Sequence, residues 1–503
     1  SSGVTLEADG YSITFGFNGS VSISTAYQVP ATVPVTGGQI AQLVSYQVPP
    51  TGTARLVTVP MATAPSGTAG RAAISTLPPS TGGEVVHPAT PATPGATLAP
   101  AGPPQVQVGT WGRTGPLASG AAYGSAVALT GGDVLQAGGV DAGGVLATAQ
   151  VYDPKTGAWT VVGSMASARM GAAAVRLADG TVLVAGGEGA DHTPLASAEL
   201  YHPATRSWSA TGSLRVARAF GAAVLLGDGD VLVAGGTGVG HRPLASAELY
   251  DPARGTWSSV APMSVARAFA AAAPLPGGGA LVAGGFHQGG ELASAERFDP
   301  ATRSWSAAGS MTQPRMMATA VALPGGDVLV VGDGAVADRY HPATGTWTAT
   351  DGMSTPRTAA AVVALPGGAV LVAGGMDDGH ALSSTERYDP VSGTWAPAGN
   401  LSAPRAFAAG AAMPDGGALV PGGADVSVGP GGAFRLGALG STDRYTLPSG
   451  PPVPPGPLSP PLASVGISAG ALVLGSAGGV FAVFLAGALV VAVLRRRRGL
   501  PPG

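Results

Sequence analysis

Charged residues of opposite sign recur along the chain in two sets with a common spacing. Six arginines each come directly before an alanine-rich apolar run, at Arg169, Arg218, Arg267, Arg315, Arg357 and Arg405. Six acids each stand two residues before an aromatic residue, at Glu199, Glu248, Glu296, Asp338, Glu386 and Asp443. One further unit has Ala121 and Gln150 at these positions, so it lacks both charges. Because a guanidinium matches a carboxylate with two parallel hydrogen bonds, we interpret the sets as structural pairs, one in each unit.

Ligand binding is the second interpretation of the arginines, some of which would then face an anionic partner. Four histidines join them as candidate binding residues because each lies in a loop after a glycine doublet: His192, His241, His287 and His380. A zinc site needs three or four ligands within about 2.0–2.2 Å of one ion. Loops of separate units lie too far apart for this. We therefore expect solvated histidines, no metal site and no cofactor.

The composition excludes several other kinds of chemistry. The chain has no cysteine, which excludes disulfides, iron–sulfur clusters and thiolate nucleophiles. A nucleophile-elbow match at 466–470 lies in a long apolar stretch, and no helix follows the glycine-rich match at 236–240. Four of the 25 basic residues form Arg495–Arg498, which leaves 21 bases against 28 acids and argues against nucleic-acid binding. We predict no catalytic residue.

The spacing of the tryptophans reveals a repeated unit, whose strands must position the arginines, acids and histidines. All seven lie 42 to 49 residues apart, at Trp111, Trp159, Trp208, Trp257, Trp305, Trp347 and Trp395. In one unit, Ala360–Leu365 reads as a first strand, a turn at 366–368 leads to a second strand at Val370–Ala373, and Ser384–Tyr388 reads as a third. Trp395 marks a fourth strand. A four-stranded unit of this size cannot bury its own faces, so we expect the units to stack around an axis.

Counting the units predicts how the ring closes. Glycine doublets mark six units, and a seventh reads Gly332-Asp333 and has a shortened loop. The last unit has no tryptophan, whereas the strand at 106–112 has Trp111 and no unit of its own. We predict an all-β, seven-bladed propeller over residues 106–447, in which this N-terminal strand completes the last blade and removes the open edge.

A Gly-Gly doublet, then a Tyr and, seven residues later, a Trp, as in Tyr152 and Trp159 or Tyr388 and Trp395, resembles the kelch repeat. The resemblance implies a propeller whose loops on the arginine side form a partner-binding surface. Copper oxidases with kelch-like propellers are the enzymes among such relatives. Their cofactor needs a tyrosine cross-linked to a cysteine, so this resemblance does not carry their activity to a chain without cysteine.

The flanking segments predict a membrane anchor. Residues 1–62 read as a small β-rich region with a hairpin at Asn18-Gly19, residues 63–105 as a Pro/Ala/Thr-rich linker, and residues 448–462 as a proline-rich spacer. Residues 463–494 hold no charge and precede a basic tail at 495–503, so we predict one transmembrane helix with its arginines in the cytoplasm. Two Gly-xxx-Gly pairs would pack that helix against another, Gly466 with Gly470 and Gly475 with Gly479.

These features predict a non-enzymatic, membrane-anchored protein whose bulk lies in the periplasm or at the cell surface and binds a protein partner through its loops. Two alternatives remain open. One is an accessory or assembly subunit of a membrane complex, held by the transmembrane helix. The other is a cell-surface carbohydrate-binding protein, which the scarcity of aromatic residues outside the repeat positions disfavours. A small-molecule substrate is not expected.

Overall fold

The computed structural model describes residues 109–447 except 289 and 429–433, together with the backbone of six short strands between Gly3 and Val59. The chain divides into two units, residues 1–100 and residues 101–503. The predicted linker 63–105, spacer 448–462, transmembrane helix 463–494 with its four glycines, and tail 495–503 lie outside the described residues. Within the described part, no helix has the length and apolar character to cross a bilayer.

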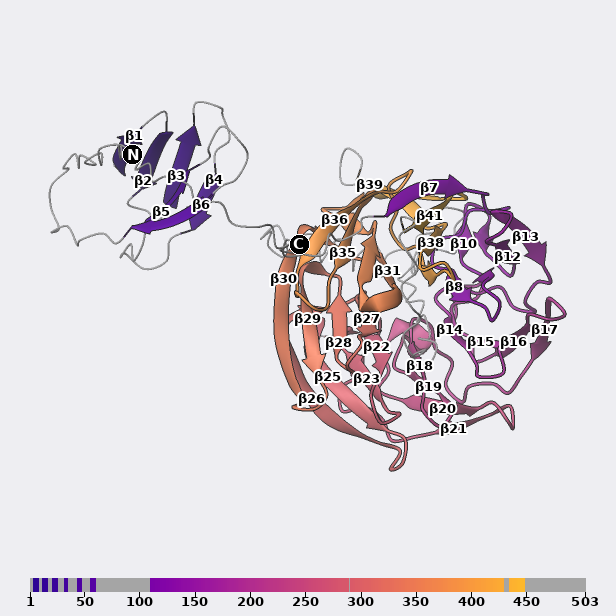
Figure 1. Cartoon of the computed structure of the whole chain (residues 1–503). Coiled ribbons are helices and arrows are strands. Elements are labelled where there is room, and N and C mark those ends of the chain that lie inside the picture. The colour runs from indigo at the N-terminus through magenta and orange to yellow at the C-terminus, as the bar shows by residue number, and fades with distance from the viewer. Residues whose placement is uncertain are drawn as a thin grey trace, which may run out of the picture. The chain divides into compact units, whose positions relative to one another are not determined.

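The second unit is a seven-bladed propeller, as predicted. Its four-stranded antiparallel blades surround one axis, and Figure 1 shows them as a ring. Blades one to three consist of β8 (Ser125–Ala128), β9 (Val134–Ala137), β12 (Ala149–Asp153) and β13 (Ala158–Val162); β14 (Ala173–Arg176), β15 (Val182–Ala185), β16 (Ala198–His202) and β17 (Ser207–Ala210); and β18 (Ala222–Leu225), β19 (Val231–Ala234), β20 (Ala247–Asp251) and β21 (Thr256–Ser259).

The other four blades repeat this order. They consist of β22 (Ala271–Pro274), β23 (Ala280–Ala283), β25 (Gly290–Asp299) and β26 (Ser304–Arg315); β27 (Thr319–Ala322), β28 (Val328–Val331), β29 (Gly334–His341) and β30 (Thr346–Arg357); β31 (Ala361–Ala364), β32 (Val370–Ala373), β35 (Ser384–Tyr388) and β36 (Trp395–Asn400); and β37 (Ala411–Ala412), β38 (Ala418–Pro421), β41 (Thr442–Thr446) and β7 (Thr110–Thr114).

The seam closes with the N-terminal strand, which confirms the predicted topology. β7 pairs with β41, so Trp111 lies opposite Tyr445 in the last blade. The strand spans Thr110–Thr114, beginning and ending later than the predicted 106–112. Closure gives the last blade a fourth strand like those of the other blades and pairs the edge of β41 that would otherwise be open.

The second strands form the core between blades. Val182–Ala185 and its equivalents are buried along their whole length, because apolar side chains on both faces contact neighbouring blades. The glycine doublet that follows allows the next blade to approach. At Gly138, which has φ +61°, a Cβ atom would lie 2.3 Å from the Arg169 carbonyl oxygen of the next blade. Only glycine fits such a contact in the left-handed region.

The repeat tryptophans bridge neighbouring blades. Trp305 lies opposite Phe298 in its own blade with ring centroids 5.1 Å apart, and its Nε1 donates to the Ala261 carbonyl of the preceding blade at 2.8 Å. Trp159 likewise reaches Thr442 of the seventh blade at 3.0 Å. The aromatic pair therefore contributes to both the sheet and the blade interface.

The loops between second and third strands differ from blade to blade. They hold the hairpins β10 (Val140–Asp141) with β11 (Gly144–Val145), β33 (Met376–Asp377) with β34 (His380–Ala381), and β39 (Ala424–Val428) with β40 (Phe434–Ala438), together with β24 (Phe286–His287) and the 3₁₀ turn η1 (Val239–His241). In blade five only Gly332 and Asp333 separate the strands, as the shortened unit predicts. The opposite turns are short, and one holds the 3₁₀ turn η2 (Pro366–Gly368).

The first unit is built from β1 (Gly3–Ala8), β2 (Tyr11–Gly16), β3 (Ser20–Thr25) and β4 (Ala31–Pro34) in one antiparallel sheet, and from the separate pair β5 (Leu43–Gln47) and β6 (Arg55–Val59). β2 and β3 form the hairpin expected around Asn18-Gly19, with Ile13 opposite Ile23. The first and fourth strands of this sheet were not expected from the sequence.

Candidate functional site

The six repeat arginines are buried beside the acids that the sequence pairs with them. In blade four, Arg267 Nη2 donates to Glu296 Oε1 at 2.9 Å, and Nη1 donates to the carbonyls of Gly284 and Ser294, each at 2.8 Å. The second carboxylate oxygen of Glu296 accepts the Ser264 N–H at 2.7 Å. The equivalent contacts join Arg169 to Glu199, Arg218 to Glu248, and Arg357 to Glu386.

The guanidinium is not bidentate to glutamate, contrary to the fork geometry that we expected. Only Nη2 reaches the glutamate, because Nη1 is held by two backbone carbonyls, those of the first glycine of the doublet and of the serine near the start of the third strand. Each arginine therefore closes the mouth of its own loop. Burial lowers the pKa of Arg267, and its hydrogen bond to Glu296 opposes that shift.

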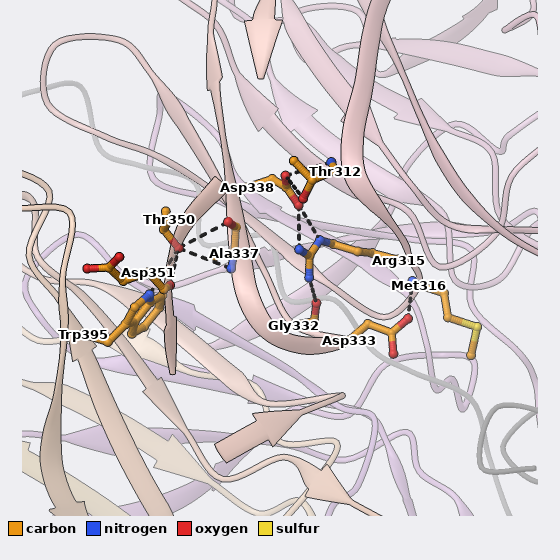
Figure 2. A network of polar contacts seen from close by, with 10 residues as sticks. All are labelled: Thr312, Arg315, Met316, Gly332, Asp333, Ala337, Asp338, Thr350, Asp351 and Trp395. Carbon is orange, nitrogen blue, oxygen red and sulfur yellow. Dashed lines mark hydrogen bonds and ion pairs between the residues drawn. The ribbon is translucent and has the colours of Figure 1, made fainter. Parts of the chain in front are cut away.

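Blades five and seven use aspartate in the same place. In blade five the shorter acid meets both Nε and Nη2 of Arg315, at 2.9 and 2.6 Å, while Thr312 donates to its other oxygen (Figure 2). Arg405 Nη2 contacts Asp443 in blade seven. All six arginines have 2% or less of their surface exposed, so none offers a free guanidinium to an anionic partner without leaving its pair.

Blade one lacks the pair and replaces it with neutral groups. Ala121 is buried where the arginine would begin, and Gln150 Oε1 accepts the Ala118 N–H at 2.7 Å, as the acid does elsewhere. Gln136 lies opposite Gln150 on β9, at a position that is valine in the other six blades. The amide thus keeps one contact of the pair without its charges.

Three of the four loop histidines have a polar partner. His287 Nδ1 lies 3.0 Å from the Ala266 carbonyl, and His380 Nδ1 lies 3.1 Å from the Asp378 carbonyl. His192 Nδ1 lies 2.9 Å from Glu188 Oε1. Among the described residues, no three His, Asp or Glu side chains are arranged to hold a metal ion.

Glu188 is a buried carboxyl group that our sequence reasoning missed. It follows a glycine doublet and is only 4% exposed, and burial raises its pKa although the hydrogen bond with His192 and the charge of nearby His241 lower it. The equivalent residues in other blades include Val140, Met376 and Ala424, which belong to the apolar cluster at the axis. A single acid at a position that the other blades give to uncharged residues is the signal that marks it.

The axis itself is closed by a ring of left-handed residues, two positions after the arginines. One residue from each blade has φ between +52° and +61°: Tyr123, Gly171, Phe220, Phe269, Met317, Ala359 and Phe407. Backbone hydrogen bonds join six of the seven neighbouring pairs; for example, Phe220 N–H donates to the Gly171 carbonyl at 2.8 Å and Gly171 N–H to the Tyr123 carbonyl at 3.1 Å. We call these seven residues the axial ring.

Side chains of the axial ring fill the end of the channel. Tyr123 and Phe407 lie 4.5 Å apart between centroids, and Phe220 and Phe269 lie 4.9 Å apart. Phe220 occupies the space that a side chain at Gly171 would need, since a Cβ there would lie 2.1 Å from the Phe220 ring. Burial raises the pKa of the Tyr123 phenol well above its usual range.

Comparisons with known proteins agree with this geometry. The kelch motif matches residues 121–166, 218–264, 270–312 and 357–402. A comparison with curated proteins finds no match. One solved structure with a similar fold is a fungal alcohol oxidase with catalytic diversity among the AA5 family, in complex with copper; it is 19% identical, and the match has a TM-score of 0.55 and covers 68% of this chain and 77% of that one. At this identity the likeness shows the fold alone.

The residues at the axis do not fit a copper centre. Copper prefers imidazole, thiolate and thioether donors in a defined geometry. The axial ring offers one phenol, Tyr123, and the buried Met317 thioether among phenylalanine, alanine and glycine, and the whole chain lacks cysteine.

Proposed function

We propose that this kelch-repeat β-propeller protein is a non-enzymatic, membrane-anchored scaffold outside the cytoplasm, which binds a protein partner through one face. The observation that carries the proposal is the contrast between the two ends of the ring. The turns between first and second strands repeat a Leu-Pro-Gly-Gly or closely related sequence, whereas the loops after the doublets differ in every blade. We call the surface formed by those loops the loop face and the opposite end the turn face.

A rigid frame with variable loops suits recognition. The paired arginines and the axial ring hold the base of each loop, so the loops differ without changing the blades. Binding residues are commonly placed on loops held by such a scaffold. Propellers serve many functions, so the proposal rests on this face and not on the fold.

The carbohydrate alternative gains no support from the aromatic side chains. The repeat tryptophans pack on Tyr or Phe, and the most exposed large apolar side chains in the described part of the chain are valines. A sugar site usually stacks a ring on an exposed aromatic face. We therefore prefer a protein partner.

Two exposed valines offer a matched test of the face. Val239 is 82% exposed on the loop face, and Val391 is 93% exposed on the turn face. A photo-cross-linking amino acid is placed at each position of the full chain in its own membrane. We expect position 239 to capture one defined protein and position 391 to capture none. Equal capture at both positions, or capture only at 391, would overturn the choice of face.

The membrane anchor has its own test. We expect the full chain to stay in the membrane pellet at alkaline pH, and a chain ended after residue 462 to become extractable. Release of the full chain under the same treatment would contradict the anchor.

A further inference from the structure

We propose that the loop face binds a basic segment of its partner, with Glu188 receiving a lysine or arginine side chain at the rim of the axial ring. This inference rests on the proposed function and names the chemistry of the partner. It begins with the position of Glu188, because the other six blades have uncharged residues there.

One carboxylate oxygen of Glu188 is not engaged by His192. Oε1 is 2.9 Å from His192 Nδ1, and the structure shows no hydrogen bond to Oε2 among the described residues. The backbone of Glu188 exchanges hydrogen bonds with Met170 of the apolar axial cluster, and its side chain is buried, so the carboxylate loses most of its hydration. A buried carboxylate is costly unless it meets a cation or donors. An incoming ammonium or guanidinium would supply both.

The surroundings of Glu188 are apolar in the centre and acidic at the rim. Half-buried Val145, Phe286 and Leu436 from three loops pack against the axial cluster. Around them the loops carry four acids besides Glu188, namely Asp141, Asp191, Asp377 and Asp425, against two arginines, Arg242 and Arg435. The adjoining segments before the first strands add Arg215 and Asp351, which offset each other. An apolar centre with a charged rim is the usual anatomy of a protein interface.

On the turn face, arginines pair with three of the acids. Arg254 pairs with Asp251, Arg339 with Asp327 at 2.7 Å, and Arg444 with Asp415. On the loop face the paired arginines are enclosed within their own blades, and the ion pair that the structure shows for Glu188 is with a histidine. The loop face therefore presents negative charge that favours a basic partner and steers its approach.

The test uses the full chain in detergent and a fluorescent nonalysine peptide, with nonaglutamate as the opposite probe. We expect nonalysine to bind and nonaglutamate not to bind. Glu188→Gln should weaken nonalysine binding at least about tenfold, because it removes one partner of a desolvated charge contact. Added salt should also weaken nonalysine binding, because it screens the attraction between the peptide and the acids at the rim.

Matched acids on the two faces provide the control. Asp141 and Asp191 on the loop face each accept a backbone N–H two residues further on, as do Asp179 and Asp228 on the turn face. Asparagine keeps that acceptor in every case. Asp141→Asn/Asp191→Asn should weaken nonalysine binding, whereas Asp179→Asn/Asp228→Asn should leave it unchanged. Equal loss in the two variants, or binding of nonaglutamate, would overturn the proposal.

Two further measurements separate the outcomes. If position 239 still cross-links its partner while nonalysine does not bind, the loop face stands and the basic partner is wrong. If both fail, the proposed function falls with it. Retained heat stability of Glu188→Gln together with lost binding supports the binding role, whereas lost stability with unchanged binding refutes it.

Discussion

Replacing one buried arginine tests whether the pairs hold the blades together. Arg267→Ala removes the contacts to Glu296, Gly284 and Ser294, and it leaves Glu296 buried with only the backbone N–H groups of Ser264 and Val265. Breaking one side of a buried pair costs roughly 3–5 kcal/mol of unfolding free energy. Glu296→Gln should also destabilise, because it leaves the guanidinium charge buried without a counter-charge.

The double replacement has a natural precedent in the same chain. Arg267→Ala/Glu296→Gln reproduces the Ala121 and Gln150 of blade one, where the amide oxygen keeps the contact to a backbone N–H. We expect its cost to fall short of the sum of the single costs by at least about 1 kcal/mol. Urea unfolding of the full chain, followed by tryptophan fluorescence, measures all three variants. Additive costs would refute the pairing, and Arg254→Ala, on an exposed pair, should leave the midpoint unchanged.

Four other predictions follow from single features. Burial raises the pKa of Glu188 in the folded state, so the protein loses the stability that the protonated carboxyl contributes as the pH rises. Calorimetry should therefore find Glu188→Gln more heat-stable than the parent at pH 7, and the difference in melting temperature should shrink on acidification. An equal difference at all pH values would contradict this. Gly138→Ala should lower the melting temperature, since its Cβ would meet the Arg169 carbonyl at 2.3 Å; no change would show that the blades shift apart freely. Tyr123→Phe should keep or raise the melting temperature, because its phenol is buried, and a clear drop would reveal a needed hydrogen bond. Removing residues 1–114 deletes β7 and exposes β41, so light scattering should detect aggregation that removal of residues 1–108 does not cause.

The repeat made most of the architecture predictable from the sequence. Seven units with an unmatched Trp111 at one end and a missing tryptophan at the other require the ring closure that β7 and β41 form. Joint absence of charge at Ala121 and Gln150 pointed to the arginine–acid contacts in the other blades. Comparison among units of one chain supplied these inferences.

Backbone geometry was what the sequence could not reveal. The axial ring has seven left-handed residues, but its sequence varies from Gly171 to Phe220 to Met317, so no residue type signals the conformation. A bulky residue in that region is strained by about 1–3 kcal/mol, and the links between blades must offset this cost. The carbonyl contacts of the arginines were hidden for the same reason, because Gly284 and Ser294 contribute only backbone atoms.

Two departures from the repeat lie at the base of the loop face. The fold tolerates an apolar residue where Glu188 stands and a glycine where Asp333 stands, as other blades demonstrate. Asp333 adopts φ +57° and accepts the Met316 N–H at 3.0 Å, and the loop beside it is the shortest of the seven (Figure 2). Both exceptions lie at the loop bases around the axial ring, whereas the pairs that hold the blades keep their charges in six units. The hydrogen bonds of Asp333 with the Met316 N–H and the Thr358 hydroxyl give that exception a structural role, so Glu188 is the exception to which we assign the proposed recognition.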